Sequence, residues 1–119
     1  WRRSFNVPPP KMEASHVYKN KIKSNILSES LKDTFERVIP YYNQKIKPLI
    51  SSKKNILIVF HGNSCRSLLK KIFNISNEKI VEFEIPTGNP LLIRFDDNSK
   101  VKEYKYLDDK RAKKILFNV

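Results

Sequence analysis

Glycine and cysteine are both scarce in this sequence, and each scarcity excludes a class of site. The 119 residues include two glycines, so the chain has no glycine-rich phosphate loop of the Walker or dinucleotide-binding type. Cys65 is the one cysteine, so an internal disulfide is impossible. This fits a reducing compartment, and we expect a cytoplasmic protein. The two histidines and the cysteine show no zinc-ligand spacing, and we expect no metal.

Long apolar runs are also absent. No run approaches the ~18 residues of a membrane-spanning helix, so we expect no membrane partner. The first residues carry charges without a following apolar stretch, unlike a signal peptide. Because the sequence does not begin with methionine, we expect a chain that is processed, truncated or only partly represented.

Acidic residues are too few to balance the basic ones. The chain has 24 Lys and Arg against 12 Asp and Glu, a formal charge of +12. Such a field favours polyanions: phosphorylated metabolites, RNA or an anionic membrane surface. The alternative is a solvated, lysine-rich surface, and the lack of a recognised RNA-binding module weakens the RNA hypothesis. The length and the 39% hydrophobic fraction indicate one folded domain over residues 1–119.

The order of predicted elements indicates an α/β domain. We expect an irregular start to about residue 27, a helix from Ser30 that kinks at Pro40 and ends near Pro48, and a strand over 55–60 buried on both faces. The later expected elements are helices over 65–73 and 76–81, strands over 83–85, 91–95 and 101–106 with a turn at 96–98, and a helix over 108–117. This order predicts a mainly parallel sheet with a hairpin at one side.

The junction between the predicted strand and the next helix is the strongest candidate site. His61, Gly62 and Asn63 follow the strand directly, where the free N–H groups of a helix N-terminus favour an anion. His61 can donate to a phosphate, Gly62 permits close approach, and Asn63 adds an amide donor. The alternative is that His61 ends the strand and bonds to a neighbouring carbonyl.

Two adjacent arginines form a second candidate. Arg2 and Arg3 offer planar forks of donors for phosphate or carboxylate, although a solvated basic terminus is the simpler interpretation. We expect His16 at the surface of a polar loop. Cys65 lies in the first turn of a helix without an adjacent base, and we expect it to be a small buried side chain.

Several segments together resemble cofactor-dependent phosphoglycerate mutases, in family order across nearly the whole chain. The segments are Trp1-Arg2-Arg3-Ser4-Phe5 with Val7-Pro8-Pro9-Pro10, Glu29-Ser30-Leu31-Lys32-Asp33-Thr34 with Arg37-Val38-Ile39-Pro40-Tyr41, Phe60-His61-Gly62-Asn63-Ser64 with Arg66, Ile85-Pro86-Thr87-Gly88-Asn89-Pro90-Leu91, and Tyr106-Leu107-Asp108. Each segment alone is weak evidence, but the set is specific.

The resemblance implies the histidine phosphatase fold, a three-layer α/β sandwich with a mainly parallel sheet. It also implies interconversion of 3-phosphoglycerate and 2-phosphoglycerate through a phosphohistidine, primed by 2,3-bisphosphoglycerate and without metal. By resemblance, His61 is the second active-site histidine, Gly62 and Asn63 line the phosphate site, and Arg2 and Arg3 hold the substrate. The family's nucleophilic histidine in an RHG motif and its acid–base glutamate in an ERHYG segment are both absent from this sequence.

Three hypotheses follow from these absences. The first is the C-terminal part of a mutase, a homo-oligomer or a chain completed by an N-terminal segment. The second is an inactive mutase-like remnant that serves as a structural or binding subunit of a larger, RNA-containing assembly. The third is a phosphatase or bisphosphoglycerate mutase of the same superfamily. In each case the strand over 55–60 lacks its usual neighbour, which leaves a sheet edge and apolar surface uncovered.

Overall fold

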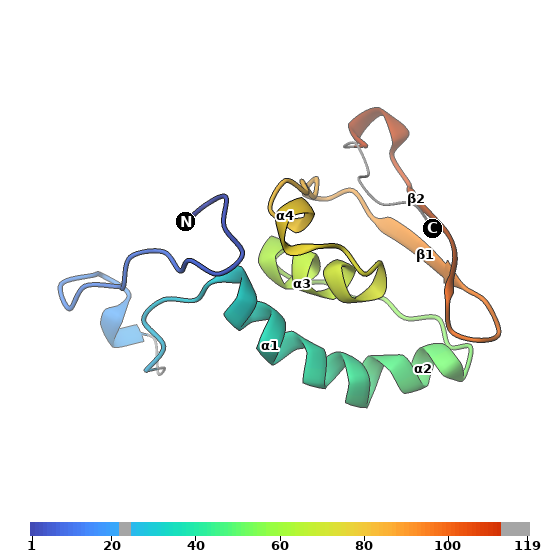
Figure 1. Ribbon diagram of the computed structural model, residues 1–119, viewed down its shortest axis with the longest axis horizontal. Helices are drawn as coiled ribbons and strands as arrows, with labels where there is room; N and C mark the ends of the chain where they lie inside the picture. Colours follow the sequence, from blue (N-terminus) through green and yellow to red (C-terminus); the bar gives the residue numbers. More distant parts are fainter. Residues whose placement is uncertain (22–24, 113–119) are drawn as a thin grey trace.

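A long curved helical arm runs along one side of the protein (Figure 1). The structure is a computed structural model that describes residues 1–21 and 25–112. The arm joins helix α1 (Leu31–Tyr41), a π-helical turn (Tyr42–Ile46) and helix α2 (Lys47–Ser51). Helix α3 (Gly62–Ile72) packs against α1, with the short helix α4 (Asn77–Ile80) beside it. A hairpin of β1 (Leu91–Phe95) and β2 (Val101–Tyr106) lies at the opposite end of the molecule from the N-terminal loop (Figure 1).

Helix α1 begins where its capping residues predict. The Ser30 hydroxyl accepts a hydrogen bond from the Asp33 N–H at 3.1 Å. The Asp33 carboxylate in turn accepts one from the Ser30 N–H at 2.8 Å. This reciprocal capping box satisfies two backbone donors that a helix start would otherwise leave free. The sequence-based prediction for this helix start is therefore confirmed.

The prediction that Pro48 ends the helix is wrong. Helix α2 continues to Ser51, with Pro48 in its first turn. The Lys47 N–H bonds to the Tyr42 carbonyl five residues back, so the chain makes one wide turn just before the proline. Pro48 then occupies a position where a missing N–H is tolerated, as at any helix start. Pro40 lies inside α1, immediately before this change of pattern.

The buried strand expected over residues 55–60 does not form. This segment belongs to no sheet, since the one sheet among the described residues is the β1–β2 pair. Leu57 and Val59 are 88% and 89% exposed, whereas Ile56, Ile58 and Phe60 are less than half exposed. The alternation is that of an extended chain with one partly covered and one open side. The prediction is wrong because a strand needs a neighbour to pair with, and the described residues supply none.

The later elements follow the prediction in part. Helix α3 starts three residues earlier than expected, α4 is capped by the Ser76 hydroxyl as expected, and residues 83–85 form no strand. The hairpin is confirmed: β1 and β2 are antiparallel, and the Asp96 carboxylate accepts bonds from two backbone N–H groups in the turn. After β2, a 3-10 turn (Asp109–Arg111) begins where a helix was expected, and the predicted continuation over 113–117 lies outside the described residues. The expected parallel sheet is likewise not part of this structure, whose described sheet is antiparallel.

The core lies between α3, α4 and the hairpin. Four buried apolar residues form its centre, Leu69, Ile75, Ile80 and Phe83. Partly buried side chains from the N-terminal segment, α1 and both strands pack around them. One small core therefore holds the starts of α1 and α3 and the N-terminal segment together, and this arrangement positions the candidate site.

Candidate functional site

A cavity of about 610 Å³ lies where the N-terminal segment meets the starts of α1 and α3. Three of the five predicted site residues, Arg2, His61 and Asn63, line it although they lie up to 61 positions apart in the sequence. Arg3 and Gly62 are not among the lining residues. Gly62 nevertheless opens α3 between His61 and Asn63, and Arg3 is exposed beside Arg2. The fold thus gathers most of the predicted site in one place.

His61 caps helix α3 with its ring. Its Nδ1 accepts a hydrogen bond from the Asn63 backbone N–H at 3.3 Å. A neutral imidazole has one donor and one acceptor nitrogen, so this bond leaves the ring proton on Nε2. His61 is therefore oriented as a hydrogen-bond donor through Nε2. The alternative interpretation, a ring bonded to a neighbouring carbonyl, does not describe this contact.

The space next to the Gly62 Cα atom is open. A Cβ built on Gly62 would meet no atom within 4 Å. The residue also lies in regular helix rather than in a left-handed conformation. Neither packing nor backbone strain within the described structure therefore requires a glycine at this position. The open space lies at the helix N-terminus, where backbone N–H groups and the helix dipole favour an anion.

Arg66 joins the cavity one turn after Asn63. Its Nη1 donates to the Asn63 carboxamide oxygen at 3.0 Å, and its Nε donates to the Phe83 carbonyl at 2.8 Å. Sequence reasoning placed Arg66 in a family motif but not in the site. The spacing of three residues from Asn63 is the signal that could have found it, because such residues face each other on a helix.

The cavity wall also carries one carboxylate that the sequence analysis did not predict. Glu29 lies just before the capping residue of α1 and is bound by both ends of the Arg37 guanidinium fork, at 2.5 Å and 3.1 Å. The Thr34 hydroxyl donates to it at 3.0 Å. The hydrogen bond from Arg37 is the main reason that the pKa of Glu29 is lowered. Arg37 offsets the negative charge of this wall.

The Lys70 side chain anchors the N-terminal segment, which carries Arg2. The Lys70 ammonium lies 5.1 Å from the centre of the Phe5 ring and 5.9 Å from that of Phe35. It also donates to the Ile75 carbonyl at 2.5 Å. Burial lowers the pKa of Lys70, since the charged form loses water. The N-terminal segment is thereby fixed to α1 and α3 close to the cavity.

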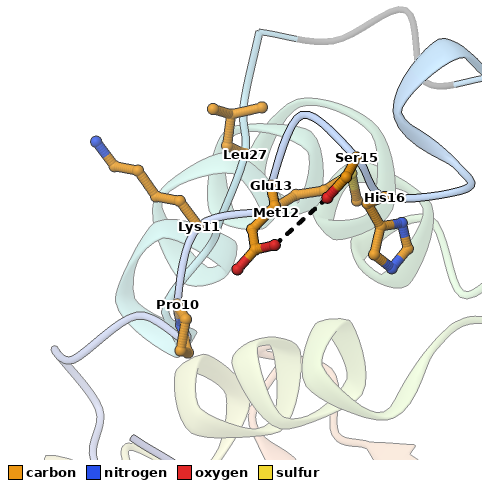
Figure 2. A pocket seen from close by; sticks show the side chains of 7 residues that line it. All are labelled: Pro10, Lys11, Met12, Glu13, Ser15, His16 and Leu27. Carbon is orange, nitrogen blue, oxygen red and sulfur yellow. Dashed lines mark hydrogen bonds between the residues drawn. The ribbon is translucent and has the colours of Figure 1, made fainter.

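The other histidine lines a separate, smaller hollow of about 430 Å³ in the N-terminal loop. Figure 2 shows its lining, in which Glu13 accepts a hydrogen bond from the Ser15 hydroxyl and His16 lies at one side. The His16 side chain is exposed, as expected. The residues that line this hollow include no arginine, and His16 is not among the residues that line the larger cavity. His16 is therefore a suitable control for substitutions of His61.

The Cys65 side chain is not placed for chemistry. The Cys65 thiol is half-buried, and burial raises its pKa to about 11. It is therefore a packing residue rather than a nucleophile at neutral pH. Within residues 1–21 and 25–112, no group of three His, Cys, Asp or Glu side chains is placed to hold a metal ion. In the same part of the chain, no helix has the length and apolar composition needed to cross a membrane.

Comparison with known proteins identifies the class. The profile of the histidine phosphatase superfamily (branch 1) matches residues 7–106, and the chain belongs to this superfamily. Its curated relatives include 2,3-bisphosphoglycerate-dependent phosphoglycerate mutases from Hyphomonas neptunium, 43% identical over 94% of this chain, and Pelagibacter ubique, 44% identical over 98%. A third, from Erythrobacter litoralis, is 44% identical over 92%. The resemblance predicted from the sequence is confirmed.

The matches cover only part of each relative. The chain corresponds to 50%, 52% and 50% of these three proteins. It therefore spans about half the length of the curated relatives it matches, and the matched half is the C-terminal one.

Proposed function

We propose that this chain is the C-terminal part of a glycolytic phosphoglycerate mutase. In this proposal the complete site interconverts 3-phosphoglycerate and 2-phosphoglycerate, and the phosphohistidine belongs to the N-terminal part. The observation that carries the proposal is the gathering of Arg2, His61, Asn63 and Arg66 around one cavity. Two guanidinium groups, an amide and an imidazole Nε2–H suit an anionic ligand with phosphate and carboxylate groups.

The residues present fit 2,3-bisphosphoglycerate, the molecule on which the relatives are named as dependent. The cavity has the volume range of small-molecule sites, and the open space at Gly62 can admit a phosphate close to the backbone. When bound, this molecule would supply the phosphoryl group that charges the nucleophilic histidine. The residues of this chain would hold its anionic groups, and no metal enters the proposal.

Each predicted site residue has a role in this proposal. His61 would donate a hydrogen bond through Nε2 to the phosphoryl group during its transfer. The hydrogen bond from the Asn63 N–H to Nδ1 already favours the tautomer with the proton on Nε2. Gly62 and Asn63 would bind phosphate oxygens at the start of α3. Arg2 and Arg3 would hold the substrate carboxylate and phosphate. Positioning and charge neutralisation of this kind are the main requirements of phosphoryl transfer.

The complete fold would be the three-layer sandwich with a mainly parallel sheet. Residues 55–60 would form a central strand once a partner strand lies beside them, and Leu57 and Val59 would then be covered. Their present exposure of 88% and 89% supports this part of the proposal. The partner would be an N-terminal segment, of the same protein or of a second chain, and the assembled protein would be a homo-oligomer in the cytoplasm.

The test compares two substitutions in the protein assembled with the N-terminal half of the Pelagibacter ubique relative. His61→Asn retains an oxygen where Nδ1 caps the helix but removes the Nε2 donor. His16→Asn is its matched control. Loss of a hydrogen bond to a charged group costs about 1.5–3 kcal/mol, so affinity for 3-phosphoglycerate should fall about 10- to 150-fold for His61→Asn. Mutase activity should fall at least as much, whereas His16→Asn should match the unmutated protein.

Full activity and affinity in His61→Asn would refute the proposed role. Thermal unfolding of both variants shows whether the fold is intact, because the capping contact is retained in His61→Asn. If the assembly does not form, calorimetric titration of the chain itself with 3-phosphoglycerate decides the binding part of the proposal.

The charge of +12 favours one second candidate. In this proposal the chain is a catalytically inactive mutase-like subunit of a larger assembly that contains RNA. Binding to single-stranded RNA should then weaken steeply between 50 and 200 mM salt, as counterion release requires. Absence of binding at the lower salt concentration would exclude this candidate.

A further inference from the structure

Arg66 is held at both ends of its guanidinium group by the protein itself. Its Nε donates to the carbonyl of Phe83, a residue that is 1% exposed in the core. Its Nη1 donates to the side-chain oxygen of Asn63 in the first turn of α3. A planar guanidinium with two fixed donors has little freedom left. Arg66 is therefore a rigid link between the core and the cavity wall.

This link decides which end of the Asn63 carboxamide is available to a ligand. A carboxamide has an oxygen that repels anions and an NH₂ group that attracts them. In a side chain with no partner, either end can face the ligand. The bond from Arg66 occupies the oxygen, so the NH₂ group is the end left for a ligand. The Asn63 backbone N–H is already used by His61, so the NH₂ is the main donor that Asn63 can still offer.

We propose that Arg66 is a positioning residue, which orients the Asn63 carboxamide so that its NH₂ group binds an anionic phosphate oxygen. This inference rests on the function proposed above and adds to it a residue and a cause of specificity. Reversing the carboxamide would place an oxygen against the anion and remove one hydrogen bond to a charged group.

A double-substitution cycle separates positioning from charge and from stability. Arg66→Lys keeps the positive charge but cannot form the two-ended link. Affinity for 3-phosphoglycerate is measured by calorimetry for the unmutated protein, Arg66→Lys, Asn63→Ala and the double variant. Arg66→Lys should weaken binding about tenfold when Asn63 is present, as expected for one hydrogen bond to a charged group. It should weaken binding less than about twofold when residue 63 is alanine, because no carboxamide remains to be oriented.

Arg94→Lys is the matched control for the chemical change. Arg94 lies on β1 and pairs with Glu103 on the hairpin surface at 3.0 Å, and it is not among the cavity residues. Its substitution should leave affinity unchanged. Thermal unfolding of every variant shows whether losing the bond to Phe83 also lowers stability. Such a loss of stability should be the same whether residue 63 is asparagine or alanine.

Each other outcome overturns the inference. An equal loss in both backgrounds would mean that Arg66 acts directly or through the fold, and no loss would mean that Asn63 needs no positioning. Inorganic phosphate is titrated as a second probe. If the unmutated protein binds phosphate but not 3-phosphoglycerate, the proposed function fails. The role of Arg66 is then tested by measuring the phosphate affinity of the same four proteins. If it binds neither, the anion site and the role of Arg66 both fail.

Discussion

Replacing Leu57 and Val59 together by lysine should weaken association with an N-terminal mutase segment by at least about two orders of magnitude and leave the fold of this chain unchanged. Both side chains are almost fully exposed, at 88% and 89%. They contribute little burial to the structure described here, so the free energy of unfolding should change by less than about 0.5 kcal/mol per substitution. The two lysines would instead place charge where a partner has to cover an apolar surface.

The magnitude follows from the area that a partner would cover. Complete burial of a leucine or valine side chain contributes about 1.5–3 kcal/mol relative to exposure. The two side chains therefore account for about 3–6 kcal/mol of association free energy. The dissociation constant should rise by about two to four orders of magnitude, and burial of an unpaired lysine would add to this.

The assay is sedimentation analysis of this chain mixed with the N-terminal half of the Pelagibacter ubique relative. Val17→Lys is the control, since Val17 is 78% exposed but lies in the N-terminal loop. It should associate like the unmutated chain. Unchanged association of the double-lysine variant would refute the reasoning, because it would show that this face remains uncovered. A large fall in its melting temperature would contradict the exposure on which the prediction depends.

Two further predictions concern single side chains. Because Arg37 lowers the pKa of Glu29 in the folded protein, the stability that Glu29 contributes is complete above its ordinary pKa of 4.5 and is lost as the pH falls through the lowered folded value. In urea unfolding, Glu29→Gln should cost on the order of 0.5–1 kcal/mol at pH 7 and progressively less as the pH falls below 4.5, whereas Glu36→Gln, which loses an exposed ion pair with Lys32 of 3.8 Å, should cost less at pH 7. Burial raises the pKa of the Cys65 thiol to about 11, so iodoacetamide at pH 8 should label the folded protein about 100-fold more slowly than the urea-unfolded protein. Equal labelling rates would show that the thiol is accessible.

Local signals in the sequence predicted much of the fold. Ser30 with Asp33, and later Ser76, each satisfy a backbone donor within four residues, so their helix starts could be read from adjacent residues. The turn at Asp96 depends on the same kind of short-range bond. These features need no information about distant parts of the chain.

The missed features depend on distant or cooperative contacts. An apolar run such as residues 55–60 is a strand only beside another strand, which the described residues do not provide. Pro48 stops an ordinary α-helix, but a wide turn before it removes the conflict. In the site, Arg2, His61 and Asn63 could be predicted from residue type and motif. The link from Arg66 to the Phe83 carbonyl requires the folded core and was therefore missed.

Because of the wide turn between α1 and α2, the ends of the helical arm can keep their positions when the number of residues between them changes. An α-helix returns to the same face every 3.6 residues. The inward residues Tyr42, Ile46 and Ile50 follow at steps of four, and a turn whose bond reaches back five residues accommodates the difference. The loss of one residue at this point can be absorbed by narrowing the turn to an ordinary α-helical one. The capped start at Ser30 and the contact between Ser51 and Ser99 at the hairpin can then stay where they are.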